Sequence, residues 1–519
     1  MMKAPFLLIA MLPAAFLLGG CEAGPDFTAP LASLPAGVSF LSTGKQAASP
    51  IAIASAASSA PADAEWWRIF RDPVLTSLEQ RVASQNLDVR TATLRVAESR
   101  AQSGVTAAAA LPSLNGTFQY QREEYSANGI VSLIPPAVTG GNTSAFTKPI
   151  NNYIIGFDAS WELDLWGHVR RQIESANATL EATAEARRDT LVSSLAEVAR
   201  DYVQLRATQE LIRIAKENLE VGQEILGVTK VRQEKGLTTG LDTESAAAQV
   251  ASIQAQLPQL HQQEVQEINA ISLLLDEPPL GLSGELIKPK AIPTNPPRVP
   301  VGIPSELARR RPDIRQAEAQ LHAATANIGV AVAEFYPSVR LNGQPTLQAL
   351  DGNNLFKGSS LQYVIGPSVT LPIFEGGRLK STLVLRERQQ QEAALTYHKT
   401  VLQAWHDVVN AMTAYRSEQD RRARLKEQVE HARAALTLAR SRYAEGVAEF
   451  TTVLDDARTV LQAEQELAQS TANVSIDLIA LYKALGGGWE LTYPDPTAAP
   501  LYVADDKPTL SPLIDAFKP

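Results

Sequence analysis

The side chains that could carry out chemistry in this 519-residue chain do not form a recognisable catalytic or metal-binding motif. No carboxylate–histidine cluster with metal-ligand spacing accompanies His398 and His406, which are eight residues apart. The three glycines at 486–488 end an expected helix, whereas a phosphate-binding loop begins one. We cannot nominate a nucleophile, a base and an orienting group together. The sequence therefore predicts no enzyme, no metal site and no bound cofactor.

One residue does indicate a covalent modification, and it is the only cysteine, Cys21. Residues 1–20 have the charge, the short apolar stretch and the small residues of an export signal peptide. Residues 18–21, Leu-Gly-Gly-Cys, resemble the bacterial lipobox, in which the cysteine receives diacylglycerol and an N-acyl chain. We predict that Cys21 is lipidated. The next residue is Glu22 and not aspartate, which resembles lipoproteins that are sent on to the outer membrane of a Gram-negative cell. The alternative is an incidental cysteine beside an ordinary cleavage site.

Composition limits the kinds of partner and the kinds of fold. The formal net charge is −9 and no basic stripe is present, so we expect no nucleic-acid partner. Only 20% of the residues are charged, and the middle of the chain is rich in Ala, Gln, Leu and Glu, which favours long helices. The lipidated N-terminal segment, 21–72, is rich in Ala, Ser and Pro and is predicted to be extended. Regular helix should begin at Asp72 and Pro73.

The chain also contains an internal repeat. An offset of 210 residues aligns 153–276 with 363–486 without a gap, and it pairs Gly236 with Gly446. Such a repeat indicates that the structural unit is half of the chain, used twice. The predicted divisions are a first repeat at 73–287, a linker at 288–302, a second repeat at 303–490 and a C-terminal tail at 491–519.

Each repeat carries two segments in which apolar and polar residues alternate. The predicted strands lie near 113–125, 152–165, 338–344 and 362–373. Alternation gives a sheet one apolar and one polar face, which suits a transmembrane barrel, although a soluble sandwich has the same pattern. Four strands cannot close a barrel, and an open edge in lipid costs several kcal/mol for each unpaired group. Three chains, which together supply twelve strands, would close a barrel. Residues 122–152 and 343–361, between the strands, are predicted to be exposed loops.

Two long helical hairpins follow the strands, at 168–275 and 378–485. Apolar residues recur every seven positions along the first helix of each hairpin, which indicates packing along a supercoiled seam. Gly236 and Gly446 lie where the hairpins reverse, because glycine suits the left-handed conformation after a helix. A non-conducting coiled-coil scaffold is an alternative interpretation, but it does not account for the strands.

Several motifs carry a resemblance to a known family. They are residues 21–27 (CEAGPDF), 66–73 (WWRIFRDP), 310–314 (RRPDI), 335–337 (FYP) and 372–377 (PIFEGG). Together they resemble the outer-membrane efflux protein family, the TolC-like outer-membrane factors, and in particular the lipoprotein branch that serves resistance-nodulation-division pumps. The resemblance covers about 21–489.

The resemblance implies a mixed α/β membrane protein that forms a homotrimer. Its twelve-stranded barrel in the outer membrane would continue into an α-helical tunnel through the periplasm. Such a protein is a passive duct for small compounds, docked onto a periplasmic membrane-fusion adaptor and an inner-membrane proton-driven pump. A duct for secreted polypeptides is the alternative with the same architecture.

Two groups of site residues are implied by the same resemblance. Asp455 falls where the family has an acidic residue that lines the closed periplasmic aperture, with Thr452 and Asp456 beside it, although a solvated helix charge is the simpler interpretation. Thr452 stands where some relatives have a second acid, and Ala448 where some have a base. The hairpin tips that would contact the adaptor are Gly236, Leu237, Thr238, Gly446, Val447 and Ala448.

Overall fold

The computed structural model describes two compact units, each built from three separate stretches of chain. The described residues are 22–30, 56–58, 64–126, 128–133, 135, 147–293, 298–300 and 310–490. Unit 1 comprises Met1–Ala29, Ser99–Leu180 and Ala319–Leu395, and unit 2 comprises Pro30–Glu98, Glu181–Glu318 and Thr396–Pro519. The predicted signal peptide, the predicted lipidation site Cys21 and the predicted tail at 491–519 lie outside the described residues.

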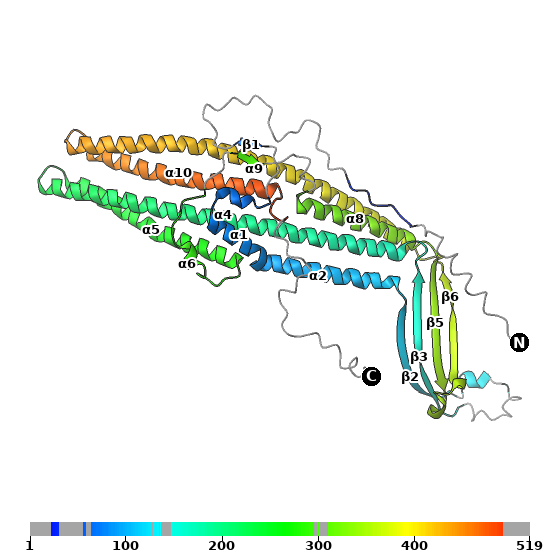
Figure 1. Ribbon diagram of the computed structural model, residues 1–519. Helices are drawn as coiled ribbons and strands as arrows, with labels where there is room; N and C mark the ends of the chain where they lie inside the picture. The colour runs from blue at the N-terminus through cyan, green and yellow to red at the C-terminus, as the bar shows by residue number, and fades with distance from the viewer. Residues whose placement is uncertain are drawn as a thin grey trace. The chain divides into compact units, whose positions relative to one another are not determined.

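Unit 1 contains a four-stranded antiparallel sheet (Figure 1). Its strands, in sheet order, are β2 (Ser113–Glu123), β3 (Ile150–Leu163), β5 (Ser338–Ala349) and β6 (Leu361–Thr370). The strand register separates the two faces of this sheet. One cross-strand row is Phe118, Ile155, Leu347 and Leu361, and the next row, on the opposite face, is Thr117, Gly156, Thr346 and Gln362. The alternation in the sequence thus becomes one apolar and one largely polar face.

Two predicted boundaries in the second strand pair are wrong. Strand β5 runs to Ala349, although residues 343–361 were expected to be a loop. Pro345 argues against a strand, and its missing N–H does interrupt the ladder to β3 between the pairs Gly156–Thr346 and Ala159–Gly343. Strand β6 ends at Thr370, before the predicted end at 373, because Pro372 cannot donate to a ladder. The rest of the predicted loop holds only two short 3-10 helices, η5 (Gly352–Asn354) and η6 (Gly358–Ser360).

The helices lie within two residues of the two predicted hairpins. The long ones are α4 (His168–Glu234) and α9 (Arg378–Ala444), each of 67 residues, and the returning ones are α5 (Gly240–Leu274) and α10 (Phe450–Ala484), each of 35 residues. These equal lengths are consistent with a repeated unit. The others are α1 (Pro73–Gln85), α2 (Leu87–Ala107), α6 (Ser283–Leu286) and α8 (Pro312–Ala333). None of the helices in the described part of the chain combines the length and the apolar character needed to cross a membrane.

The core of unit 2 is formed by the tryptophan motif and the helices around it. Trp66 and Trp67 belong to a 3-10 helix, η1 (Trp66–Phe70), so the prediction of an extended segment up to residue 72 is wrong here. Trp66 stacks on Tyr482 of α10 at 5.5 Å between ring centroids. The predicted helix start is confirmed, because the Asp72 side chain caps α1 by accepting from the Val74 N–H at 2.8 Å. A short parallel pair, β1 (Ala56–Ser58) and β4 (Arg298–Pro300), completes the unit.

Candidate functional site: the hairpin tips

The two hairpins reverse through the same backbone geometry, at tips that belong to unit 2. Gly236 and Gly446 adopt positive φ angles of 68° and 79°. In each tip the next residue, Leu237 or Val447, donates its N–H to the carbonyl five residues earlier, at 2.8 and 2.9 Å. This contact closes a helix end and favours glycine in the left-handed position. Leu237 and Val447 are then 64% and 74% exposed, so each tip presents a large apolar side chain to solvent.

The remaining predicted tip residues differ in their surroundings. Thr238 and Ala448 are both half-buried. Thr238 donates its hydroxyl to the carboxylate of Asp242 in the first turn of α5. Because Ala448 has no polar side chain, the second tip has no equivalent bond, and the two tips are chemically distinct.

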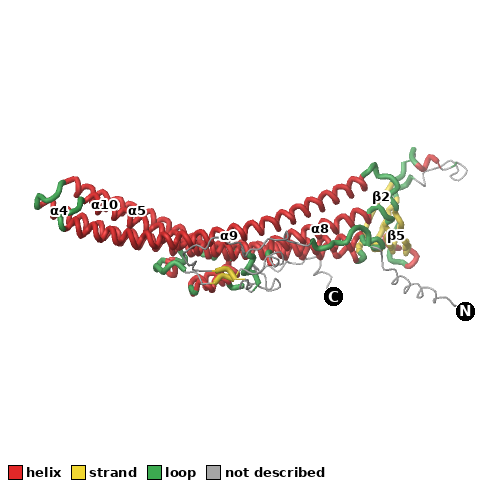
Figure 2. The backbone as a smooth tube through the Cα atoms, turned by 90° about the horizontal axis from the view of Figure 1, so that it is seen from above, coloured by secondary structure: helices red, strands yellow, loops and turns green. Residues whose placement is uncertain are grey.

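An apolar cluster beneath the tips joins the two hairpins, and we call it the tip cluster. Its buried members are Ile225, Ala246, Ala439, Tyr443, Phe450, Val453 and Leu454. They come from all four helices α4, α5, α9 and α10, which lie alongside one another (Figure 2). Tyr443 and Phe450 face each other across the second turn, with ring centroids 5.6 Å apart. The ends of both hairpins are therefore packed together as one apolar layer.

Arg232 fastens the first hairpin to the second at this cluster. Its guanidinium donates to the carbonyl oxygens of Tyr443 at 3.0 Å and Ala444 at 3.4 Å, and it lies 4.6 Å from the centre of the Tyr443 ring. A cation at the C-terminal end of a helix such as α9 is favourable, because the last carbonyls carry partial negative charge. The ring face adds a cation–π attraction.

Further polar contacts tie the hairpins together along their length. Arg440 pairs with Glu224 at 2.9 Å, and Arg458 donates to Gln249 at 2.8 Å. Glu464 of α10 accepts from Asn218 of α4 at 2.8 Å. These bonds connect α4 to α9, α5 to α10 and α4 to α10, so separating the hairpins would break a series of contacts.

The predicted aperture residues lie at the start of α10. Thr452 and Asp455 are exposed, three residues apart and therefore on one side of the helix. Within the chain the Asp455 carboxylate lies 3.8 Å from Arg458, and its side chain is 75% exposed. Asp456 is half-buried, and its side chain leaves the helix about 100° away from that of Asp455. Thr452 and Asp455 thus have room for contact with another chain. Asp456 lies four residues after Thr452, on the same side of the helix as Thr452, but it is less exposed than either residue.

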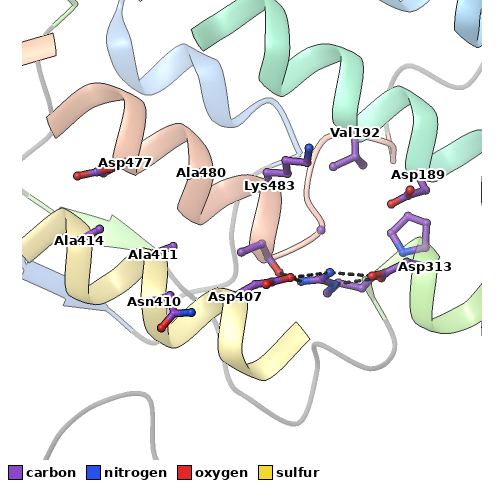
Figure 3. A pocket seen from close by; sticks show the side chains of 14 residues that line it. Asp189, Val192, Asp313, Asp407, Asn410, Ala411, Ala414, Asp477, Ala480 and Lys483 are labelled. Carbon is purple, nitrogen blue, oxygen red and sulfur yellow. Dashed lines mark hydrogen bonds and ion pairs between the residues drawn. The ribbon is translucent and has the colours of Figure 1, made fainter. Parts of the chain in front are cut away.

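A second candidate, an acidic cavity of about 460 Å³, was not predicted from the sequence (Figure 3). Asp189, Asp313, Asp407 and Asp477 line it, each from a different helix, so no sequence pattern could reveal them. Arg311 binds Asp313 at 2.7 Å and Asp407 at 3.3 Å. Burial, reinforced by Glu418, raises the pKa of Asp477 to about 6. Burial and the charge of Asp313 also raise the pKa of Asp189. Arg311 and Lys483 also line the cavity and offset part of its negative charge, so its acidity identifies no ligand.

The tip residue with the most contacts, Arg232, was not singled out in the sequence. It aligns with Arg442 at the offset of 210, which marks it only as a repeated residue. Its partner Tyr443 lies 211 positions away, and the first hairpin has Gln233 in the equivalent place.

In the described part of the chain, no three His, Cys, Asp or Glu side chains are arranged to hold a metal ion.

Comparisons with known proteins agree over nearly the whole chain. Residues 78–276 and 303–487 match the family described as outer membrane efflux protein. An antibiotic efflux pump outer membrane protein of Pseudomonas putida is 31% identical, over 93% of this chain and 96% of its own. A pyoverdine export outer membrane protein of Pseudomonas aeruginosa is also 31% identical, over 93% and 97%. The solved outer-membrane channel OprN is similar with a TM-score of 0.82 and 31% identity, over 90% of this chain and all of its own.

Proposed function

Because the chain belongs to the outer membrane efflux protein family, we propose that it is a passive duct through which an efflux pump exports small compounds. As a member of this family, the protein acts in efflux at the outer membrane of a Gram-negative cell. Its relatives carry the names of antibiotic, toluene and pyoverdine export systems, which favours small compounds over polypeptides as cargo. A duct for secreted polypeptides is the second candidate.

The observation that carries the proposal is the sheet of unit 1. One face is lined by apolar side chains such as Phe118, Phe157 and Leu347, and the other by polar residues such as Thr117 and Gln362. In the described structure β2 and β6 each pair on one side only. Unpaired strand edges are costly in lipid, and pairing β2 of one copy with β6 of the next removes them. Three copies would give a closed barrel of twelve strands around a polar interior.

The two helical hairpins would form the periplasmic part of the duct. In a trimer, six hairpins from two repeats in each chain make a helical tunnel that ends at the tips. The exposed side chains of Leu237 and Val447 are the surface that we assign to a membrane-fusion adaptor, which connects the duct to a proton-driven pump in the inner membrane. Three copies of Asp455 around the axis would line the aperture with negative charge and admit cations preferentially. Thr452 and Asp456 are the flanking positions.

Lipidation of Cys21 completes the proposal. Diacylglycerol and an N-acyl chain on this residue would hold the mature chain in the outer membrane, and several acyl chains anchor firmly where one does not. The duct performs no chemistry on what passes through it, so the proposal includes no enzymatic step and no cofactor besides this lipid.

Native mass spectrometry of the protein released from membranes in mild detergent tests the closed trimer. We expect a species of three chains that persists when the protein is diluted. A monomer as the main membrane-inserted species would contradict a barrel shared between copies.

A further inference from the structure

The segment that follows the predicted lipidation site is bound to the surface of unit 1 by specific contacts. The Ala23 N–H donates to the Trp166 carbonyl at 3.0 Å, directly after strand β3. Glu22, Gly24, Pro25 and Asp26 are exposed, so this segment is not part of a core. Its position must therefore come from particular bonds and from the fit of its backbone.

Arg171, near the start of α4, makes most of these bonds. Only 3% of its side chain is exposed, and it binds Asp26 at 2.5 Å and Glu174 at 2.7 Å. It also donates to the Ala23 carbonyl at 3.3 Å and lies 3.7 Å from Glu22. A buried guanidinium needs charged or polar partners around it. Three of the four partners named here belong to the segment after the cysteine, so Arg171 and the segment depend on each other.

Two glycines allow the segment to approach α8 closely. Gly24 has a φ of 90°, and a Cβ placed on it would lie 2.5 Å from the Cα of Gly329. A Cβ on Gly329 would lie 2.9 Å from the Ala23 carbonyl oxygen and 2.8 Å from the Arg171 side chain. Neither side of this contact tolerates a side chain. The surface of α8 is therefore shaped to the backbone at Gly24.

The far end of the segment is fixed by an aromatic contact. Phe27 stacks on His322 of α8, with ring centroids 4.4 Å apart and planes inclined by 13°. His322 in turn binds Glu174 at 2.8 Å, and Glu174 is the carboxylate that also pairs with Arg171. Asp26, Arg171, Glu174, His322 and Phe27 thus form a closed chain of contacts. Residues 22–27 are held at both ends.

These contacts lie where the aromatic side chains of unit 1 gather at the end of the sheet. Trp166, whose carbonyl binds Ala23, stacks on Tyr336 at 4.9 Å and donates its indole N–H to the Pro337 carbonyl at 2.8 Å. Phe335 and Tyr336 are 41% and 43% exposed. Tryptophan and tyrosine favour the boundary between lipid and water. The N-terminal end of the bound segment therefore lies at the level where the sheet would leave the membrane.

We propose that unit 1 contains a docking site for residues 22–27, held mainly by Arg171, which fixes the acylated N-terminus at the base of the sheet. This inference rests on the proposed lipidation of Cys21. Successive Cα atoms are about 3.8 Å apart, so the acyl chains start within one residue of the docked Glu22. The lipid then packs beside the aromatic end of the sheet, and the anchor is a positioned part of the duct instead of a free tether.

Hydrogen–deuterium exchange of the intact lipoprotein in detergent tests the docking directly. We expect the amide of Ala23 to exchange at least tenfold more slowly than in Gly24→Ala, which alters only the exposed segment and leaves the body of unit 1 unchanged. Arg171→Ala should lose the same protection. The matched control is Arg378→Ala, because Arg378 is also an arginine of unit 1 and pairs with Glu334 at 3.3 Å and Glu375 at 2.6 Å.

A second measurement follows the lipid itself. With a protease site inserted after Pro30, the palmitate-labelled peptide should stay with the wild-type trimer after dilution into empty micelles and leave Gly24→Ala within minutes. Equal exchange and equal release in wild type and Gly24→Ala would overturn the docking site, even in a protein that conducts normally. Absence of palmitate label would instead contradict the lipidation of Cys21, and the exchange measurement would still test the docking.

Discussion

Arg232 and Tyr443, 211 residues apart in sequence, hold the two hairpin tips together by two different contacts. The guanidinium donates to the Tyr443 carbonyl at 3.0 Å and lies 4.6 Å from the centre of the same residue's ring. The equivalent residue of the second hairpin, Arg442, is exposed, so the two hairpins are not symmetric at their ends. If the aperture widens when the hairpins separate, Arg232 is a residue that resists this separation within one chain.

Replacing Arg232 by alanine should therefore favour the open tip. A charge at a helix C-terminus and a cation–π contact together contribute about 1–2 kcal/mol, which is roughly a 5- to 30-fold shift between closed and open. The measurement is entry of a large antibiotic such as vancomycin into cells that express the variant. Lys235→Ala removes a positive charge from the same tip and is the control. Equal sensitivity of the two variants would contradict a role for the Arg232–Tyr443 contact.

Glu79 in α1 makes the stability of unit 2 depend on pH. Its side chain is fully buried, neither carboxyl oxygen has a hydrogen-bond partner in the described structure, and burial raises its pKa well above the ordinary value of about 4.5. The folded state therefore holds the proton more tightly than the unfolded state. The contribution of Glu79 to the free energy of folding is fully present below pH 4.5. It is lost as the pH rises through the pKa that Glu79 has in the folded state.

Glu79→Gln should accordingly raise the melting temperature at pH 8 and change it little at pH 4.5. Melting followed by circular dichroism at both pH values gives the difference. Glu98→Gln, at an exposed position of α2, should leave the melting temperature unchanged at either pH. An equal shift for Glu79→Gln at the two pH values would show that packing, and not ionisation, is responsible.

Gly156 and Gly366 occupy matching positions in the two predicted repeats, but only one of them is sterically required. A Cβ on Gly156 would lie 2.5 Å from the Pro345 carbonyl oxygen, whereas a Cβ on Gly366 meets nothing within 4 Å. Gly156→Ala should force β3 away from β5 and lower the yield of membrane-inserted trimer several-fold, while Gly366→Ala keeps it. The yield is read from heat-resistant trimers in membrane fractions. Equal yields would mean that the sheet adapts at Pro345.

Cys21→Ser tests whether the lipid and the strands hold the protein independently. The variant should incorporate no palmitate, yet a fraction should remain in the membrane after alkaline washing, because a closed barrel has no unpaired edges in lipid. Complete loss from the membrane would contradict the assignment of the four strands to a barrel.

The long helices and the strands could be predicted from the sequence because their signals are local and strong. Glycines 236 and 446 mark the reversals, and alternation marks the sheet faces. The predicted end of strand β5 is too early because proline disfavours a strand. Only the pairing of β5 with its neighbours shows that the strand continues past Pro345. The contacts of the candidate sites were harder to predict from the sequence. The contacts of Arg232 with Tyr443 and of Arg171 with Asp26 join residues more than 140 positions apart, and such pairs leave no periodic signal.

The most direct test of the duct is single-channel recording of the purified trimer in planar bilayers, with Asp455→Ala measured beside the wild type. We expect cation-selective conductance in the wild type. In the variant we expect a larger conductance and weaker cation selectivity, because the charges that narrow the aperture are gone. A trimer that inserts but conducts in neither form would contradict the duct and would favour a non-conducting scaffold.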